Sequence, residues 1–247
     1  MGFVAAMVSC TPTGNWEAGT METTVTPPTG GVSLSQSYWG HRPGPRGFKT
    51  VIIDAGHGGH DSGAVGRRVR EKDVALDTAR RLQRKLQGDF KVVMVRDSDR
   101  FIDLNKRVSI ANRYKSAVLV SIHYNHSGRS SRGPETYYWR VDSYGLAKRL
   151  QREMARVSPS ERGSRGQVRR RLRLTRNTKI PSVLVEIGYL SNYSDARLSR
   201  SSSYRDKMAE AMARAIRRQA LVGDAGLGPL PKPINAPISR PTDPPGS

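Results

Sequence analysis

VIIDAGHGGHDSGAVG, residues 51–66, combines an apolar run of strand length with a glycine-rich loop around one histidine. Three β-branched residues lead into Asp54, a pattern typical of a buried strand that ends at the edge of a sheet. His57 then stands among glycines at positions 56, 58 and 59. Glycine permits tight backbone turns and leaves space beside its neighbours. This loop therefore predicts a place where a ligand or substrate can approach His57.

Strands and helices alternate around this stretch, over about residues 48–222. Apolar runs of strand length, rich in β-branched and aromatic residues, occupy 51–56, 91–97, 117–125, 135–141 and 182–190. Apolar residues recur at helical spacing in 72–86, 103–115, 143–157 and 203–221; in the first of these, Val74, Leu82 and Leu86 nearly share one face. The alternation predicts a single α/β domain, with a mostly parallel mixed sheet flanked by helices on both faces.

The composition of the chain is strongly basic. Among 247 residues, Lys and Arg number 42 and Asp and Glu 21, which gives a net charge of +21. Such a charge predicts attraction to polyanions, such as nucleic acid, an anionic membrane surface or an acidic cell-envelope polymer. The single cysteine excludes an intrachain disulfide. No apolar run approaches the roughly 20 residues needed to span a bilayer.

Both ends of the chain are expected to lie outside the folded domain. Residues 1–47 begin with MGFVAAMVSC, which is similar to the end of a bacterial lipoprotein signal with Cys10 as the lipidated residue, and continue as a Thr-, Pro-, Gly- and Ser-rich disordered tether. The alternative is an ordinary terminus with an incidental cysteine, since the basic opening of a signal peptide is missing. Residues 223–247 are dense in Pro and Gly and predict a disordered tail.

Four residues that can bind metal or carry protons are expected at one edge of the sheet. His57 follows the first strand, His123 and Glu186 lie late in two others, and Glu71 opens the first long helix. Functional groups of open α/β sheets collect beyond the carboxyl ends of the strands. The sequence therefore predicts that these four side chains meet.

Their chemistry suits a catalytic zinc site. Two imidazoles and a carboxylate bind zinc and leave a fourth position open for water, while a second carboxylate can act as general base. His57, Glu71 and His123 are thus candidate ligands, and Glu186 is the candidate proton shuttle. The separations of 14 and 52 residues match no compact zinc motif. On pattern alone, structural histidines and a Glu186–arginine ion pair remain alternatives.

Five ordered blocks of the sequence resemble the zinc-dependent N-acetylmuramoyl-L-alanine amidases of the type called amidase-3. These blocks are VIIDAGHGGHDSGAVG, REKDVALDTARRL, VRDSDRFIDLNKRVSIAN, SIHYNHSGRSSRGPETYYW and LTRNTKIPSVLVEIGYLSN. The family's metal histidines fall on His57 and His123, its metal glutamate on Glu71 and its catalytic glutamate on Glu186. Asn125 and Arg176 lie in matching blocks and are candidates for binding substrate.

The resemblance implies one Zn2+ per domain and hydrolysis of the amide that joins the lactyl group of N-acetylmuramic acid to L-alanine of the stem peptide. It implies a monomer that acts on peptidoglycan after export to the periplasm or cell envelope, with membrane anchoring through Cys10 if that residue is lipidated. The segment between Arg140 and Thr175 has room for one helix and a strand but no obvious further helix to plug the site. A cavity open without an activator is therefore expected.

Two other functions remain as alternatives. A zinc carboxypeptidase acting on stem peptides would use the same metal chemistry. The basic run ERGSRGQVRRRLRLTRNTK, residues 161–179, would suit a nucleic-acid-binding protein. No helix-turn-helix, zinc-finger or RNA-recognition motif accompanies this run, so no nucleic-acid partner is expected.

Overall fold

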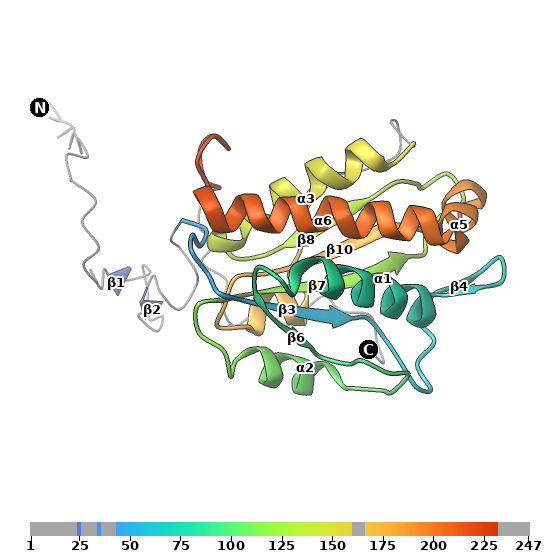
Figure 1. Ribbon diagram of the computed structural model, residues 1–247, viewed down its shortest axis with the longest axis horizontal. Coiled ribbons are helices and arrows are strands. Elements are labelled where there is room, and N and C mark those ends of the chain that lie inside the picture. The colour runs from blue at the N-terminus through green and yellow to red at the C-terminus, as the bar shows by residue number, and fades with distance from the viewer. Residues whose placement is uncertain (1–23, 26–33, 36–42, 160–165, 232–247) are drawn as a thin grey trace, which may run out of the picture.

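The computed structural model describes residues 24–25, 34–35, 43–159 and 166–231. The expected lipid-anchor position Cys10, most of the expected tether and the end of the expected tail lie outside these residues. A six-stranded sheet forms the centre of the described part, and helices cover it (Figure 1).

The sheet is mixed and mostly parallel, as predicted. Its strands follow the order β6-β3-β7-β10-β8-β9. The four parallel strands are β6 (Lys91–Met94), β3 (Thr50–Ala55), β7 (Ala117–Asn125) and β10 (Ser182–Tyr189). The two that run opposite to them are β8 (Glu135–Tyr138) and β9 (Gly166–Arg169). The parallel strands therefore bring their carboxyl ends to one edge.

Helices cover both faces of the sheet, which confirms the predicted fold class. The first face carries the longer helices, α1 (Glu71–Leu86), α3 (Tyr144–Val157) and α6 (Ser202–Val222). The second face carries the shorter helices α2 (Leu104–Ala111) and α4 (Arg173–Asn177). The predicted apolar face of α1 is buried in the larger core, with Leu82 and Leu86 fully enclosed.

Several short elements escaped prediction. They are β1 (Thr24–Val25), β2 (Leu34–Ser35), β4 (Val65–Gly66), β5 (Val69–Arg70), η1 (Val141–Ser143), α5 (Tyr193–Arg200) and α4. β9 lies in the segment that was expected to have room for a strand, but the sequence did not predict its bounds. Elements of two to eight residues offer too few turns or alternations for a periodic pattern. The predicted helix 103–115 also ends early, because the chain turns at Asn112.

The folded part extends beyond the predicted boundary at residue 222. Leu227 is only 3% exposed, and its carbonyl accepts a hydrogen bond from Lys148 Nζ on α3. Asp224 accepts a 2.7 Å hydrogen bond from the backbone of Gly44, which joins the two ends of the domain. These residues are therefore ordered by contacts with α3 and Gly44, which a Pro- and Gly-rich composition does not reveal.

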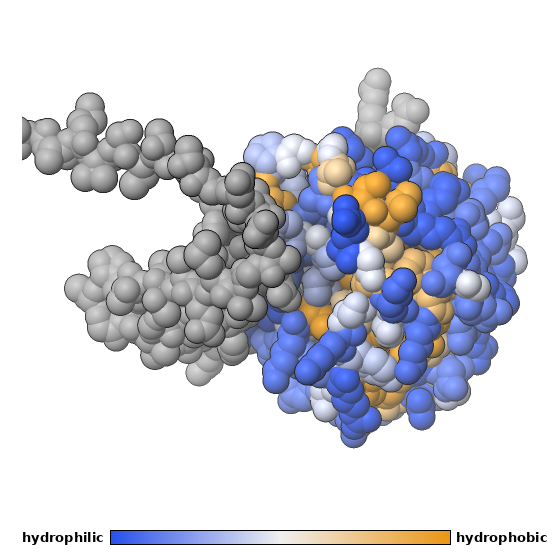
Figure 2. Space-filling view, turned by 60° about the vertical axis from the view of Figure 1, so that its left-hand side comes forward, coloured by the Kyte–Doolittle hydropathy of each residue, from blue (hydrophilic) through white to orange (hydrophobic). Residues whose placement is uncertain are grey.

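Water-facing side chains are predominantly hydrophilic on the face shown in Figure 2, with smaller apolar areas between them. Among the described Lys and Arg residues, those that are buried are Lys72, Arg96, Arg107 and Arg140. The remaining described cations reach solvent at least in part. Within the same residues, no helix combines the length and the apolar character needed to cross a bilayer.

Candidate active site

The register of the sheet brings two predicted site residues side by side. Glu186 on β10 is the direct partner of His123 on β7, in parallel strands. Paired residues on neighbouring strands point to the same face of a sheet. The neighbouring strand β3 ends at Ala55, so His57 follows in the loop beyond the same edge.

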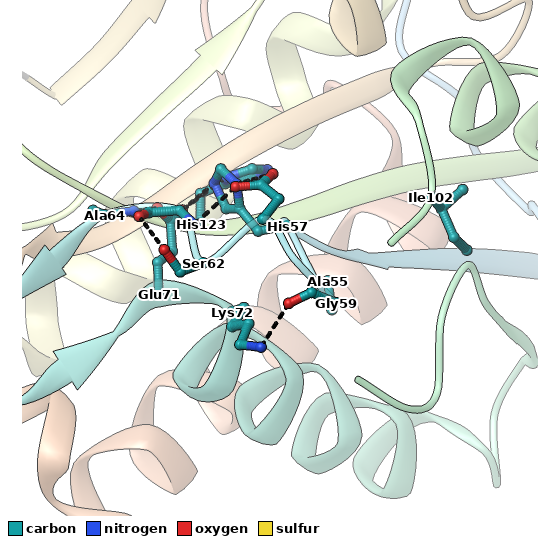
Figure 3. Close-up of polar contacts among 12 residues, drawn as sticks. Ala55, His57, Gly59, Ser62, Ala64, Glu71, Lys72, Ile102 and His123 are labelled. Atoms are coloured by element: carbon teal, nitrogen blue, oxygen red, sulfur yellow. Dashed lines mark hydrogen bonds and ion pairs between the residues drawn. The ribbon is translucent and has the colours of Figure 1, made fainter. Parts of the chain in front are cut away.

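The carboxylate of Glu71, the first residue of α1, lies close to both histidines (Figure 3). Its Oε1 is 3.1 Å from His57 Nε2 and 2.9 Å from His123 Nδ1. The candidate ligand atoms of the three residues all lie within 4.8 Å of one another. Two nitrogens and one carboxylate oxygen at such spacing are a donor set that can hold a metal ion. The structure thus brings together the predicted ligand set.

Two glycines make this convergence possible. A Cβ at Gly56 would lie 2.4–2.7 Å from atoms of the His123 ring. At Gly63, a Cβ would lie 2.5 Å from His57 Cδ2 and 2.6 Å from Glu71 Oε2. Such distances are shorter than van der Waals contact, so any larger residue would displace a candidate ligand. The glycines around His57 therefore allow the candidate ligands to pack closely, in addition to allowing the backbone to turn.

Two buried arginines hold the backbone of the His57 loop. His57 itself has φ 58°, a left-handed conformation that non-glycine residues rarely adopt. Arg107 Nη2 donates to the His57 carbonyl, and Arg96 Nη2 donates to the Gly56 carbonyl, each at 2.7 Å. Both arginines also donate to the carbonyl of Ala55. Strained backbone persists where surrounding contacts fix it, and it concentrates at functional sites.

Asp54 compensates the charge of Arg107 beneath this loop. Its carboxylate is fully buried, lies 2.6 Å from Arg107 Nη1 and accepts a 2.7 Å hydrogen bond from Ser121. Burial alone would raise the pKa of Asp54, but Arg107 and Ser121 outweigh it and hold the pKa below its usual value. Asp54 is therefore an ionised structural partner of Arg107.

We expect Asp54→Ala to lower the free energy of unfolding by about 3–5 kcal/mol, because it leaves the Arg107 cation buried without its partner. Denaturant unfolding of the metal-free protein measures this change. The matched control is Asp73→Ala, which removes an exposed ion pair with Arg70 and should cost about 0–1 kcal/mol. Equal losses in both variants would contradict this account.

Contacts within the candidate ligand group shift the pKa values of Glu71 and His57. Burial alone would raise the pKa of Glu71, but hydrogen bonds with His123 and His57 outweigh it and hold the pKa well below its usual range. Burial would lower the pKa of His57, yet Glu71 and Asp61 raise it overall. A bound metal requires neutral imidazole, so protonation of His57 competes with metal binding. Metal affinity is therefore expected to weaken as the pH falls.

Asp61 orients His57 and was not identified from the sequence. Its Oδ2 lies 2.7 Å from His57 Nδ1, and its Oδ1 accepts a hydrogen bond from the backbone of Gly63. A carboxylate on one ring nitrogen fixes the tautomer and leaves the other nitrogen for a metal. The arrangement therefore points His57 Nε2 toward Glu71 and His123.

Removal of this partner tests its role. We expect Asp61→Ala to weaken metal affinity by about 10–100-fold, the range for residues that orient a metal ligand. Competition with a chromophoric chelator measures the affinity. Asp103→Ala is the control. Asp103 lines the same cavity, but its carboxylate caps α2 by accepting a hydrogen bond from the backbone N–H of Lys106. An unchanged affinity in Asp61→Ala would show that His57 needs no such support.

A cavity of about 320 Å³ opens over the three candidate ligands. Glu186 and Asn125 line it, as predicted for residues that face substrate, and Asn125 Nδ2 donates to the Tyr137 hydroxyl. Arg176 is not among the lining residues; its Nε donates to Asn177 on α4 instead. Arg170 lines the cavity from the same basic run. The sequence of that run does not show that Arg170 lines the cavity and that Arg176 does not.

The segment between Arg140 and Thr175, where a further helix could block the site, contains few elements of secondary structure. Between Arg140 and Thr175, the described residues form η1, α3, β9 and the first turn of α4. α3 packs on the first face of the sheet, whereas the cavity opens on the side of α2 and α4. None of these described elements therefore fills the cavity.

Comparison with known proteins agrees with this geometry. The family model described as N-acetylmuramoyl-L-alanine amidase matches residues 51–218. The amidase LytC of Bacillus subtilis strain 168 is 36% identical over 168 residues, which are 66% of this chain and 34% of LytC. This chain thus spans about a third of LytC. The germination-specific N-acetylmuramoyl-L-alanine amidase of the same organism is 32% identical over 192 residues, 70% of this chain and 81% of that protein.

A solved structure shows the same fold. The catalytic domain of CwlV, an N-acetylmuramoyl-L-alanine amidase from Bacillus (Paenibacillus) polymyxa var. colistinus, superposes with a TM-score of 0.65 and 37% identity. The match covers 69% of this chain and 97% of that domain. The sequence blocks, the fold and the site geometry agree, and the chain belongs to the N-acetylmuramoyl-L-alanine amidase family.

Proposed function

We propose that this chain is a zinc-dependent peptidoglycan hydrolase that cleaves the amide between the lactyl group of N-acetylmuramic acid and L-alanine of the stem peptide. The observation that carries the proposal is the meeting of His57, Glu71 and His123 in one cavity, with Glu186 in direct register beside His123. Membership of the amidase family supports the choice of bond.

The donor set favours zinc over the common alkaline-earth ions. Calcium and magnesium prefer shells made of oxygen, whereas two imidazoles and one carboxylate suit zinc. Three protein ligands also leave a position for water or substrate. His57, Glu71 and His123 would hold the ion, and the hydrogen bond between His57 and Asp61 would orient one of the imidazoles.

The chemistry that bound zinc supplies is Lewis acidity, which polarises a carbonyl and lowers the pKa of water toward neutrality. Glu186 then acts as the proton carrier. Its carboxylate accepts a proton from the attacking water and donates it to the nitrogen of the departing alanine. Asn125, held by Tyr137, would donate or accept a hydrogen bond with substrate at the cavity wall. These steps cleave the amide without a covalent intermediate.

The cell envelope is the proposed site of action. Peptidoglycan lies outside the cytoplasmic membrane, so an enzyme that cleaves it there must be exported. Lipidation of Cys10 would anchor the domain to the membrane. Metabolic labelling with a fatty acid would then tag the wild-type chain and leave Cys10→Ser unlabelled, and labelling of both would refute anchoring at this residue.

The bond is tested by mass spectrometry of purified muropeptides incubated with the full chain, with and without a zinc chelator. Release of an intact stem peptide from intact sugar, abolished by chelator and restored by zinc, is the expected result. A stem peptide shortened at its end while still attached to sugar would establish a carboxypeptidase instead. Salt-sensitive binding that is stronger to DNA than to sacculi would favour the nucleic-acid alternative.

A further inference from the structure

Carboxylates outnumber arginines in the lining of the cavity. Its lining includes five carboxylates, those of Asp54, Asp61, Glu71, Asp103 and Glu186. The arginines in the lining are Arg107 and Arg170. Asp54 is paired with Arg107, and a bound zinc ion would offset Glu71, but a peptide carboxylate beside Asp103 or Glu186 would still be repelled. Its binding therefore depends on a cation that still has hydrogen-bond donors to offer.

Arg107 has little to offer, because four of its five N–H groups already donate within the protein. It is 3% exposed, and each of its three guanidinium nitrogens already donates to the protein. Nη1 donates to Asp54 and to the carbonyl of Ala55, and Nη2 donates to the carbonyl of His57. Nε donates to the carbonyl of Ile102. Arg107 is thus a structural support of the His57 loop.

Arg170 is placed differently. Its backbone N–H donates to the carbonyl of Tyr138 at 2.8 Å, which fixes its position directly after β9. Its guanidinium carbon lies 5.4 Å from the centre of the Tyr137 ring, a cation–π distance. Within residues 43–159 and 166–231, no side chain or carbonyl accepts a hydrogen bond from this guanidinium. Its N–H donors thus remain available at the cavity wall.

The platform beneath Arg170 is rigid. Tyr137 is 1% exposed, and its hydroxyl donates a 2.7 Å hydrogen bond to Glu135, which is fully buried. A half-buried arginine over a fixed ring loses less conformational freedom on binding a partner than a flexible surface cation. The ring therefore pre-orients Arg170 before any ligand arrives.

We propose that Arg170 forms a carboxylate-binding subsite for the stem peptide, an inference that rests on the proposed function. The planar guanidinium can make two parallel hydrogen bonds to one carboxylate, which gives direction as well as charge. A stem peptide held there by its carboxylate would extend across the cavity, so that its first amide reaches Glu186 and the candidate metal ligands. The subsite thus discriminates stems with free carboxylates from amidated stems.

The preceding residue provides a matched control. Arg169 belongs to the same basic run and also stacks on aromatic rings, those of Tyr138 and Trp139. Arg169 is not among the residues that line the cavity, and its Nε donates to the carbonyl of Trp139 instead. Arg169→Gln therefore removes the same charge and a similar stacking contact outside the cavity.

The experiment compares the zinc-loaded full chain, Arg170→Gln, Arg170→Lys and Arg169→Gln. Each acts on a muropeptide with free stem carboxylates and on the same muropeptide with those groups amidated. We expect Arg170→Gln to reduce the ratio of kcat/KM for free over amidated stems by about 10–100-fold, mainly through KM. Arg170→Lys keeps the charge without the two-pronged geometry and should give an intermediate ratio. Arg169→Gln should retain the wild-type ratio.

The outcomes distinguish a failure of the Arg170 subsite from a failure of the proposed function. Cleavage of both stems with equal kcat/KM by the wild type would overturn the subsite and leave the proposed function intact. The subsite would fall equally if Arg170→Gln kept the wild-type ratio, or if Arg169→Gln lost as much as Arg170→Gln. No cleavage of either stem would overturn the proposed function and the subsite together. Amidation of one carboxyl group at a time then identifies the group that Arg170 binds.

Discussion

Glu186→Ala is expected to retain bound zinc and to lose turnover. General acid–base catalysis by a positioned side chain typically contributes about 10²–10⁴-fold, so kcat should fall by a factor in this range. Glu186 lines the cavity but is not part of the group formed by His57, Glu71 and His123. Its removal should therefore leave zinc stoichiometry unchanged. Muropeptide turnover and metal analysis of the same sample measure both quantities.

Glu186→Gln sharpens this test because it keeps the shape of the side chain. A glutamine cannot accept and return a proton at neutral pH, so it should lose as much turnover as alanine. If Glu186 acted only by packing or by hydrogen bonding, glutamine would retain much of the activity. An active Glu186→Ala protein, or loss of zinc from either variant, would refute the assigned role.

The fold could be predicted from the sequence because its main strands and helices are long enough to show a clear hydrophobic pattern. Each of the strands β3, β7 and β10 carries a run of buried apolar residues, and α1 and α6 span several helical turns. The spacing of apolar residues along such elements predicts whether each is a strand or a helix. The edge strand β9 and the short helices α4 and α5 depend on neighbours for their stability, and no period marks them.

The sequence predicts that the candidate ligands meet, but it does not identify the residues that hold them in place. His57, His123, Glu71 and Glu186 stand out because they lie in or next to apolar elements where polar groups are costly. Asp61, Arg107 and Arg170 lie in polar stretches, where another charged residue is unremarkable in sequence. Their roles come from distances across the fold, such as the 2.6 Å between Arg107 and Asp54. Only tertiary structure supplies these pairs.

His57→Ala should lose both zinc and activity, which distinguishes a ligand from a proton carrier. With two ligands left, the site cannot complete the coordination that zinc favours. Zinc that binds only the folded wild-type chain should raise its free energy of unfolding by about 2.7 kcal/mol at a concentration 100 times the dissociation constant. For His57→Ala we expect no such rise under the same conditions. Thermal unfolding with and without zinc measures the difference.

His60→Ala is the matched control for this loss. His60 lies three residues further along the same loop, and its ring packs on Phe101 with centroids 4.2 Å apart, away from the ligand group. That variant should keep the zinc-dependent rise in stability. Retention of the rise in His57→Ala would instead show that His57 is not a ligand.

The backbone at residue 57 adds a second test of the same residue. Alanine, like histidine, is strained at the observed φ of 58°, whereas glycine adopts such values readily. His57→Gly should therefore be more stable than His57→Ala without metal, by up to about 1 kcal/mol, while both lack the response to zinc. This pair separates the strain at residue 57 from the function of its side chain. If His57→Gly regained the zinc response, the loss in His57→Ala would come from the backbone rather than from the missing imidazole.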